Sequence, residues 1–156
     1  MLSLDSEVRL RIGRRTFEFE PGIYVYSGSA MNSLEPRIKR HVRSFRGEKV
    51  NKFWNIDHLL PHIASMEVVW AESDSKVECR MVALLKSKGF EVVPHFGDSD
   101  CRSGCGGHLL AAIDNTMAIV VECVSACYES LGLRPEMFIP GKAEKNQSVK
   151  ERNLQG

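Results

Sequence analysis

An arginine and a histidine spaced one helical turn apart, Arg37 and His41, closely follow a Tyr-Ser-Gly sequence at residues 26–28. The i,i+4 spacing brings the two side chains to the same side of a helix. Arginine offers a forked donor for phosphate, Tyr26 a hydroxyl that donates or releases a proton, and Gly28 a close backbone approach. Together these residues could hold a phosphate. The alternative is a surface arginine beside a histidine that bonds a backbone carbonyl.

A carboxylate, Glu78, lies on the inward half of a second expected helix, beside Met81 and Leu85. Carboxylates are rarely buried without a partner or a metal. Glu78 is therefore either an ion-pair partner, with Arg37 as the candidate, or a ligand for a hard divalent cation such as Mg²⁺ or Mn²⁺.

A third group lies in the glycine-rich loop over residues 95–107, where Cys101, Cys105 and His108 form a C-x3-C-x2-H pattern. Zinc accepts nitrogen and sulfur ligands at such short spacing, and Asp100 or His95 would supply the fourth ligand. The alternative is a turn in which the glycines adopt left-handed conformations and no metal binds.

The five cysteines are an odd number, and the charged start of the chain does not suit a secretion signal. These features argue against a disulfide framework and predict a cytoplasmic protein. No apolar run approaches the ~20 residues needed to span a bilayer, so we expect no membrane association. Cys79, Cys123 and Cys127 fall on expected helices, where we predict them to be small core residues.

Positive charge is concentrated in the first third of the chain. Residues 1–52 hold 11 Lys/Arg against 6 Asp/Glu, an excess of 5, whereas residues 53–156 hold 10 against 14. Lys39, Arg40, Arg43 and Arg46 are expected on the solvent face of the first long helix. Such a face can meet a phosphate backbone; the alternative is a solvated basic surface. The residues predicted to contact a nucleic acid, DNA with RNA not excluded, are Gly28, Ser29, Arg40, Arg43, Arg46, Lys49 and Lys52.

The elements that position these side chains follow from apolar periodicity. Strands are expected over residues 7–12, 16–27, 66–70, 91–94 and 108–113, and helices over 33–45, 54–60, 76–88 and 114–132. This order predicts a single α+β domain over residues 1–141, with a polar, disordered tail over 142–156. The last helix is apolar around much of its circumference, which predicts packing on the sheet or, alternatively, a homodimer interface.

Several short motifs occur in order along the chain. They are GxYxYxGSA from residue 22, then LExRIxRH, WxIDxLL, VEC and FGxSDC followed by HL. This set resembles a small archaeal and bacterial family of domains of unknown function that is related to the GIY-YIG nucleases. Some members of that family are fused to the DNA-repair enzyme endonuclease III. The resemblance spans roughly residues 11–110.

The resemblance implies a GIY-YIG-like fold, a small and mostly antiparallel sheet flanked by helices, and a metal-dependent DNA endonuclease. Carried over position by position, it implies that Tyr26 and Gly28 form the second motif and that Arg37 clamps the phosphate. It also implies His41 as a supporting residue and Glu78 as the ligand of the catalytic cation.

Two departures from the family pattern bear on activity. Residues 22–24 spell Gly-Ile-Tyr, but they cannot be the first motif, because that motif belongs to a neighbouring strand and only Val25 separates Tyr24 from Tyr26. In the family the first motif lies one strand earlier, just ahead of residues 2–5. We therefore expect either that this start of the chain omits the residues carrying its tyrosine, or that the protein lacks this tyrosine and is inactive in this form. Asn55 also replaces a usual histidine. A nucleic-acid-binding module without catalysis and a protein-interaction domain remain the alternatives.

Overall fold

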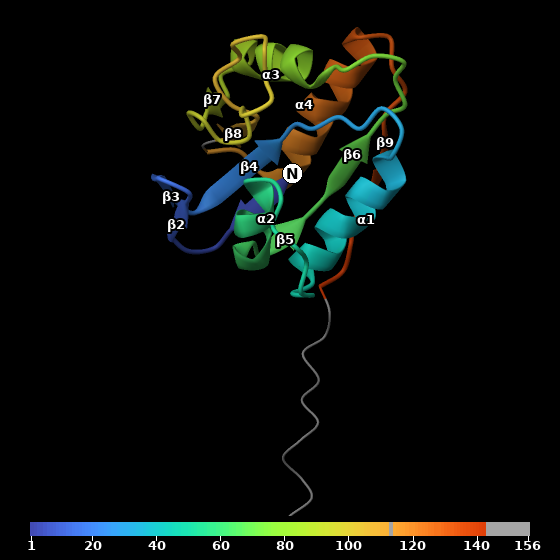
Figure 1. Cartoon of the computed structure of the whole chain (residues 1–156). Coiled ribbons are helices and arrows are strands. Elements are labelled where there is room, and N and C mark those ends of the chain that lie inside the picture. Colours follow the sequence, from blue (N-terminus) through green and yellow to red (C-terminus); the bar gives the residue numbers. More distant parts are fainter. Residues whose placement is uncertain (113, 143–156) are drawn as a thin grey trace, which may run out of the picture.

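The centre of the molecule is an antiparallel sheet of five short strands, with β4 (Gly22–Tyr26) in the middle (Figure 1). The structure is a computed structural model that describes residues 1–112 and 114–142. The strands lie in the order β5 (Ser65–Met66), β1 (Leu2–Leu4), β4, β8 (Leu109–Ala112) and β7 (Glu91–Val92). Each neighbouring pair is antiparallel.

Strand β4 separates two hydrophobic cores because successive side chains of a strand point to opposite faces of the sheet. Tyr24 and Tyr26 pack in the first core, whereas Ile23 and Val25 pack in the second. Tyr26 is the last residue of β4 and pairs with Leu109 of β8. The tyrosine is thereby placed at the end of the central strand, where the chain leaves the sheet.

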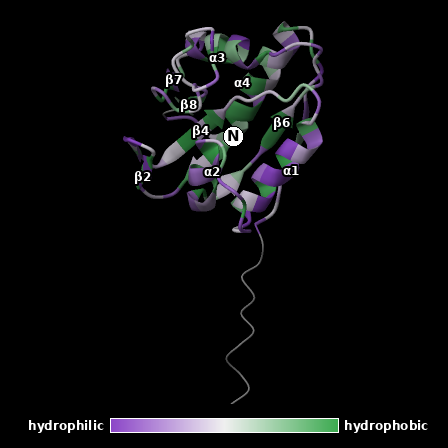
Figure 2. Ribbon diagram, viewed as in Figure 1, coloured by the Kyte–Doolittle hydropathy of each residue, from purple (hydrophilic) through white to green (hydrophobic). Residues whose placement is uncertain are grey.

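The first core lies under two α-helices, a short 3-10 helix and a β-hairpin. Their bounds are α1 (Leu34–Phe45), α2 (Ile56–Leu59), η1 (Leu60–His62), β2 (Val8–Ile12) and β3 (Arg15–Phe19). Phe19, Phe45 and Leu59 are fully or almost fully buried there. The outer side of α1 is hydrophilic (Figure 2). This helix therefore has one wet face and one face against the sheet.

The second core lies against α3 (Glu78–Ser87) and α4 (Met117–Ser130), which contact each other (Figure 1). Val82, Leu85 and Val120 have no exposed surface. Helix α4 is hydrophobic along much of its length (Figure 2). The predicted packing of this helix in the core is confirmed, and the homodimer stays a prediction.

The chain breaks at Pro21-Gly22 instead of continuing as one strand over residues 16–27. Strand β3 pairs with β2, whereas β4 joins the central sheet. Proline has no N–H for a ladder, and Gly22 has φ 150°, which other residues rarely adopt. The predicted bend at this dipeptide is thus a change from one sheet to another.

The α+β class and the mostly antiparallel sheet flanked by helices are confirmed. Two short strands have no counterpart among the expected elements: β1, and β9 (Glu136–Phe138), which pairs with β6 (Val68–Trp70). Strands of three residues carry too little alternation to be recognised. Of the expected tail, residues 143–156 lie outside the described residues. Over the part of the chain that the structure describes, no helix has the length and apolar character to cross a bilayer.

Candidate active site and metal-binding cluster

Arg37 and Tyr26 come together at the end of β4, as the spacing of the sequence predicts. The ring of Tyr26 is half-buried, and its burial raises the pKa of the phenol, although the neighbouring guanidinium of Arg37 acts in the opposite direction. Gly28 lies close to both side chains: a Cβ at this position would be 3.3 Å from Tyr26 Cε1 and 3.5 Å from Arg37 Nη2. The absence of a side chain at residue 28 therefore allows this close approach.

The Arg37 guanidinium is held from two sides. Its Nη1 donates a hydrogen bond to the backbone carbonyl of Ser29, and its Cζ lies 4.4 Å from the centre of the Trp54 ring. The second contact is a cation–π interaction. Because one nitrogen is bonded and the planar group is stacked, the guanidinium has a defined orientation while retaining further N–H donors.

Ser29 also connects this arginine to Glu78. The Ser29 hydroxyl donates to Glu78 Oε2 over 2.5 Å, and the Ser27 hydroxyl donates to the Glu78 backbone carbonyl over 3.1 Å. Within the described residues, no ion pair joins Glu78 to Arg37 directly, so the ion-pair alternative is replaced by a serine bridge. We call Tyr26, Ser29, Arg37 and Glu78 the candidate active site.

The His41 ring packs between Tyr26 of the candidate active site and Trp54. It lies edge-on to Tyr26, with centroids 6.1 Å apart, and to Trp54, with centroids 5.9 Å apart. His41 Nδ1 is 3.7 Å from Asp57 Oδ1, which is too long for a hydrogen bond. The histidine is buried, neither of its ring nitrogens has a hydrogen-bond partner within the described residues, and its supporting role stays a prediction.

Asp57, which was assigned no role from sequence, bonds several groups next to His41. This fully buried carboxylate accepts two hydrogen bonds from Arg40, at 3.0 and 2.8 Å, and one each from the backbone N–H groups of Phe53 and Trp54. Burial alone would raise its pKa, but the adjacent His41 and these donors hold the pKa of Asp57 well below its usual range.

Arg40 is not on the solvent face of α1, so that expectation is wrong. Only 23% of its side chain is exposed, because the guanidinium pairs with Asp57 and lies 4.7 Å from the centre of the Trp54 ring. Helical periodicity could not reveal this placement, because the partner that holds Arg40 away from the solvent is Asp57, a buried carboxylate 17 residues further along the chain.

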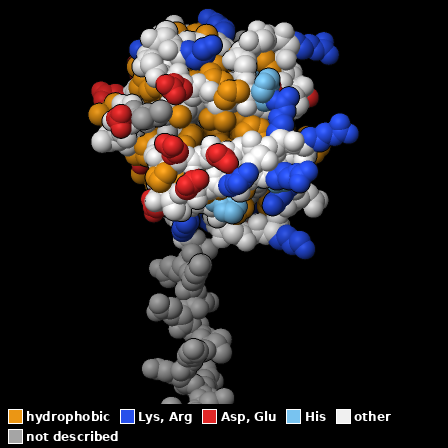
Figure 3. Space-filling view, turned by 90° about the vertical axis from the view of Figure 1, so that its left-hand side faces the viewer, with side chains coloured by type: hydrophobic (Ala, Val, Ile, Leu, Met, Phe, Trp, Pro, Cys, Tyr) orange, Lys and Arg blue, Asp and Glu red, His pale blue; other side chains and the backbone are white. Residues whose placement is uncertain are grey.

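The other basic residues of the predicted nucleic-acid surface are exposed. Arg43 pairs with Glu48 at 2.6 Å, and Arg46 donates to the Gly141 carbonyl. Lys49 and Lys52 lie in the segment that follows α1. On the face displayed in Figure 3, Lys and Arg gather toward one edge, whereas Asp and Glu lie toward the opposite side. The net charge near zero therefore conceals a separation of charge.

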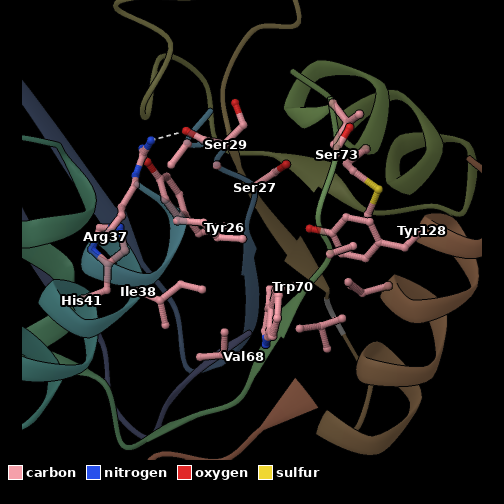
Figure 4. A pocket seen from close by; sticks show the side chains of 18 of the residues that line it. Tyr26, Ser27, Ser29, Arg37, Ile38, His41, Val68, Trp70, Ser73 and Tyr128 are labelled. Carbon is pink, nitrogen blue, oxygen red and sulfur yellow. Dashed lines mark hydrogen bonds between the residues drawn. The ribbon is translucent and has the colours of Figure 1, made fainter. Parts of the chain in front are cut away.

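A pocket of about 510 Å³ opens beside the candidate active site. Tyr26, Ser29 and Arg37 line one side of it, and Trp70 and Tyr128 face them (Figure 4). The Tyr128 hydroxyl points into the pocket, and burial raises the pKa of this phenol. Glu78 reaches the pocket wall through its hydrogen bond to Ser29.

Three cysteines and a histidine form a separate cluster next to this site. The thiols of Cys79, Cys101 and Cys105 and the imidazole of His108 each offer a ligand atom, and these atoms all lie within 4.8 Å of one another. Cys79 Sγ is 3.5 Å from Cys101 Sγ, 3.6 Å from Cys105 Sγ and 3.6 Å from His108 Nε2, and Cys101 Sγ is 3.1 Å from Cys105 Sγ. This Cys3His cluster can hold a metal ion.

Cys79 was predicted to be a core residue, and that prediction is wrong. It supplies the fourth group of the Cys3His cluster in place of Asp100, which is exposed, or His95, which contacts Asp98 at 3.3 Å. The sequence feature that could have indicated a functional role for Cys79 is its position in the VEC motif, directly after Glu78. Sequence spacing could not pair it with Cys101, because 22 residues separate the two.

The acidity of the thiols differs within the cluster. Hydrogen bonds from the Cys105 backbone N–H and thiol lower the pKa of Cys101 to about 6, whereas burial raises the pKa of Cys79 to about 12. Cys101 is therefore the thiol most ready to lose its proton and act as a ligand.

A family model described as "Domain of unknown function DUF123" matches residues 1–133. No curated protein matches the chain, and no solved structure does. The matched residues include the candidate active site, the pocket residues named above and the whole Cys3His cluster.

Proposed function

The chain belongs to the DUF123 family, whose description assigns no function, and we propose that it is a metal-dependent endonuclease that hydrolyses phosphodiester bonds of DNA. The observation that carries the proposal is the convergence of Tyr26, Ser29, Arg37 and Glu78 at one end of β4. Hydrolysis of a phosphodiester requires an attacking water, neutralisation of charge on the phosphate and an oxygen-rich site for a cation.

Arg37 is the phosphate ligand in this proposal. The stacking of its guanidinium on Trp54 and its bond to the Ser29 carbonyl orient the remaining N–H groups, which suit the oxygens of a phosphate. Tyr26 stands beside it as a hydrogen-bond donor, because a phenol with a raised pKa keeps its proton at neutral pH.

Glu78 and Ser29 offer a carboxylate and a hydroxyl, the hard oxygen ligands that Mg²⁺ and Mn²⁺ prefer. A cation held there would polarise the phosphate and lower the pKa of a water molecule. The chain's own part is to keep the Glu78 carboxylate beside Ser29 and near the pocket that would receive the DNA backbone.

The test is cleavage of nicked, flapped and branched DNA by the full chain with Mg²⁺ or Mn²⁺. We expect Glu78→Gln and Arg37→Ala to lose at least about 100-fold in rate, as expected when a group that stabilises the transition state is removed. The matched controls, Glu122→Gln and Arg80→Ala, change exposed residues on helices and should cleave like the parent. Absence of cleavage by the parent, or equal rates for Glu78→Gln, would refute the proposal.

A second candidate is a DNA-binding module without catalysis on the same surface. It is favoured by one observation: Ser29 already bonds one nitrogen of Arg37 and one carboxylate oxygen of Glu78, which reduces the groups left for a cation. This candidate predicts salt-dependent binding without cleavage, with a slope set by the number of phosphates neutralised. RNA competitors in the same assay would show which nucleic acid is preferred.

For the Cys3His cluster we propose zinc. With a Zn–S distance of about 2.3 Å and tetrahedral angles, two sulfur ligands lie about 3.8 Å apart and a sulfur and a nitrogen about 3.6 Å apart. The distances from Cys79 Sγ, 3.5 and 3.6 Å to the other two sulfurs and 3.6 Å to His108 Nε2, are close to these values, whereas the Cys101–Cys105 separation of 3.1 Å is shorter. Four protein ligands leave no open position, which is typical of a structural zinc rather than a catalytic one.

A further inference from the structure

A backbone hydrogen bond joins the Cys3His cluster to the residue that follows Tyr26 at the end of β4. His108, the last of the four residues in sequence, accepts a hydrogen bond through its carbonyl from the Ser27 N–H over 2.9 Å. Gly97 lies between the side chains of Tyr26 and His108, since a Cβ at residue 97 would be 3.4 Å from Tyr26 Cε2 and 3.5 Å from His108 Cβ. A displacement of His108 would therefore be transmitted to the end of β4.

The cluster is also joined to Glu78, because Cys79 is the next residue. Both belong to the first turn of α3, whose N-cap residue, Val77, makes no side-chain capping bond. Valine is among the poorest N-caps, so no side-chain cap holds the first turn, although Val77 itself is buried in the second core. The polar contacts described at this turn are the hydrogen bonds from Ser27 and Ser29 to Glu78, beside the cluster itself.

The loop that supplies Cys101 and Cys105 is held at its base by backbone hydrogen bonds from His95 to Gly106 and from His108 to Phe96, and its tip carries the two cysteines. It runs between β7 and β8, contains no helix or strand, and has positive φ angles at Gly97, Gly104 and Gly106. Loops of this length in a compact domain are usually functional or need stabilisation. Three of the four cluster residues lie in or beside this loop, so a metal there would bind the loop, β8 and α3 together.

We propose that the metal of the Cys3His cluster positions the candidate active site, holding the first turn of α3 with Glu78 against the end of β4 with Tyr26 and Ser29. Cys79 and His108 are thus positioning residues that act through Glu78 and Ser27. The inference rests on the proposed function for what the site does. The positioning itself is measured without any reaction.

The experiment is hydrogen–deuterium exchange of the full chain, with zinc bound and after zinc removal by a chelator. Loss of zinc should speed exchange at least about tenfold, as for local opening, in peptides covering residues 26–29 and 77–81. The last turn of α1 with its C-cap (residues 42–46) is the internal reference and should be unchanged, whereas the β2–β3 hairpin is unsuitable because Phe17 and Phe19 pack on Phe96 of the cysteine loop. Cys79→Ser should behave like the metal-free parent, whereas Cys123→Ser, a thiol outside the cluster, should keep both zinc and protection.

His108→Cys is the conservative rescue, because it keeps four zinc ligands. It should bind one zinc and restore slow exchange in residues 26–29 and 77–81. Equal exchange in these peptides with and without zinc would overturn the inference. Uniform acceleration that includes residues 42–46 at the end of α1 would also overturn it, because the metal would then support the whole fold rather than the site.

DNA cleavage measured on the same samples separates the two proposals. A local exchange response in a protein that never cleaves DNA rejects the endonuclease and leaves the positioning role intact. Cleavage that persists unchanged without zinc, together with unchanged exchange, rejects the positioning role and leaves the endonuclease intact.

Discussion

Ser29 Oγ lies 2.5 Å from Glu78 Oε2, and this contact, together with the bond from the Ser27 hydroxyl to the Glu78 carbonyl, joins the segment that leaves β4 to the first turn of α3. Ser29 and Glu78 are 49 positions apart in the chain. The same serine accepts a hydrogen bond from Arg37 through its carbonyl, so it stands between the candidate phosphate ligand and the candidate cation ligand.

Removing this hydroxyl should impair the site more than the fold. We expect Ser29→Ala to lower the free energy of unfolding by about 1 kcal/mol and the DNA cleavage rate by at least about tenfold, because Glu78 loses its partner. Ser29→Thr keeps the hydroxyl and should retain most activity. Ser33→Ala is the control, because the Ser33 side chain makes no capping bond. Similar cleavage rates for Ser29→Ala and Ser33→Ala would contradict the role of this contact.

A methyl group at residue 28 should disturb the contact between Tyr26 and Arg37. We expect Gly28→Ala to weaken DNA binding by about tenfold, or about 1.4 kcal/mol, because the new Cβ would lie 3.3 Å from the Tyr26 ring. Gly141→Ala is the matched control, since a Cβ there meets nothing within 4 Å. Fluorescence anisotropy with labelled DNA measures both, and equal affinities would show that this approach is unimportant.

The buried carboxylate of Asp57 should make stability depend on pH. Because the folded-state pKa of Asp57 is lowered, its contribution is present above the ordinary carboxyl pKa of about 4 and is lost as pH falls through the lower folded-state value. Asp57→Asn should cost about 3 kcal/mol at pH 7, since Arg40 is left unpaired.

Urea unfolding of the parent and of Asp57→Asn between pH 2 and pH 7 measures this effect. We expect the difference between the two proteins to shrink as the solution becomes more acidic. Asp5→Asn, at an exposed position, should track the parent throughout. A difference that stayed constant down to the lowest pH would show that the charge of Asp57 is not the cause.

The exposed lysines after α1 should contribute more to DNA binding than the paired arginine beside them. Lys49→Ala and Lys52→Ala should each reduce the slope of log affinity against log salt by about 1 if each neutralises one phosphate. Arg43→Ala should have a smaller effect, because Arg43 is paired with Glu48. Lys86→Ala, on α3, is the control. An unchanged slope for both lysine variants would place the DNA on another surface.

Zinc stoichiometry should identify the fourth ligand. We expect one zinc per chain for the parent, for Asp100→Asn and for His95→Ala, and none for Cys79→Ser, because only Cys79 lies among the other ligand atoms. Metal analysis of protein purified without a metal-affinity tag measures this directly. Retention of zinc by Cys79→Ser, or loss of zinc from Asp100→Asn, would instead favour the set expected from sequence spacing, in which Asp100 or His95 is the fourth ligand.

Local patterns of the sequence were sufficient to predict the strand and the helix that carry the candidate active site. The alternation around Tyr24 and Tyr26 predicted a strand, and the spacing of Ile38, Val42 and Phe45 predicted the helix that follows. Arg37 and His41 were correctly expected to lean toward Tyr26, because both period and spacing are properties of one short segment.

Contacts between distant segments could not be obtained in this way. Asp57 pairs with Arg40 and shields it from the solvent, and Ser29 stands in place of the direct Arg37–Glu78 ion pair that was one of two alternatives for Glu78. Each of these depends on which side chain lies nearest after folding. Composition and periodicity carry no information on that distance.

The amino-acid order alone therefore determined the α+β class, the Tyr26–Arg37–His41 group and the cysteine loop as a candidate metal site. Only the tertiary structure decided that Cys79 completes the metal site and that Ser29 bridges Arg37 to Glu78. The physical reason is that helical and strand periods act over a few residues. The Cys3His cluster and the serine bridge instead require the packing of β4, α3 and the loop before β8.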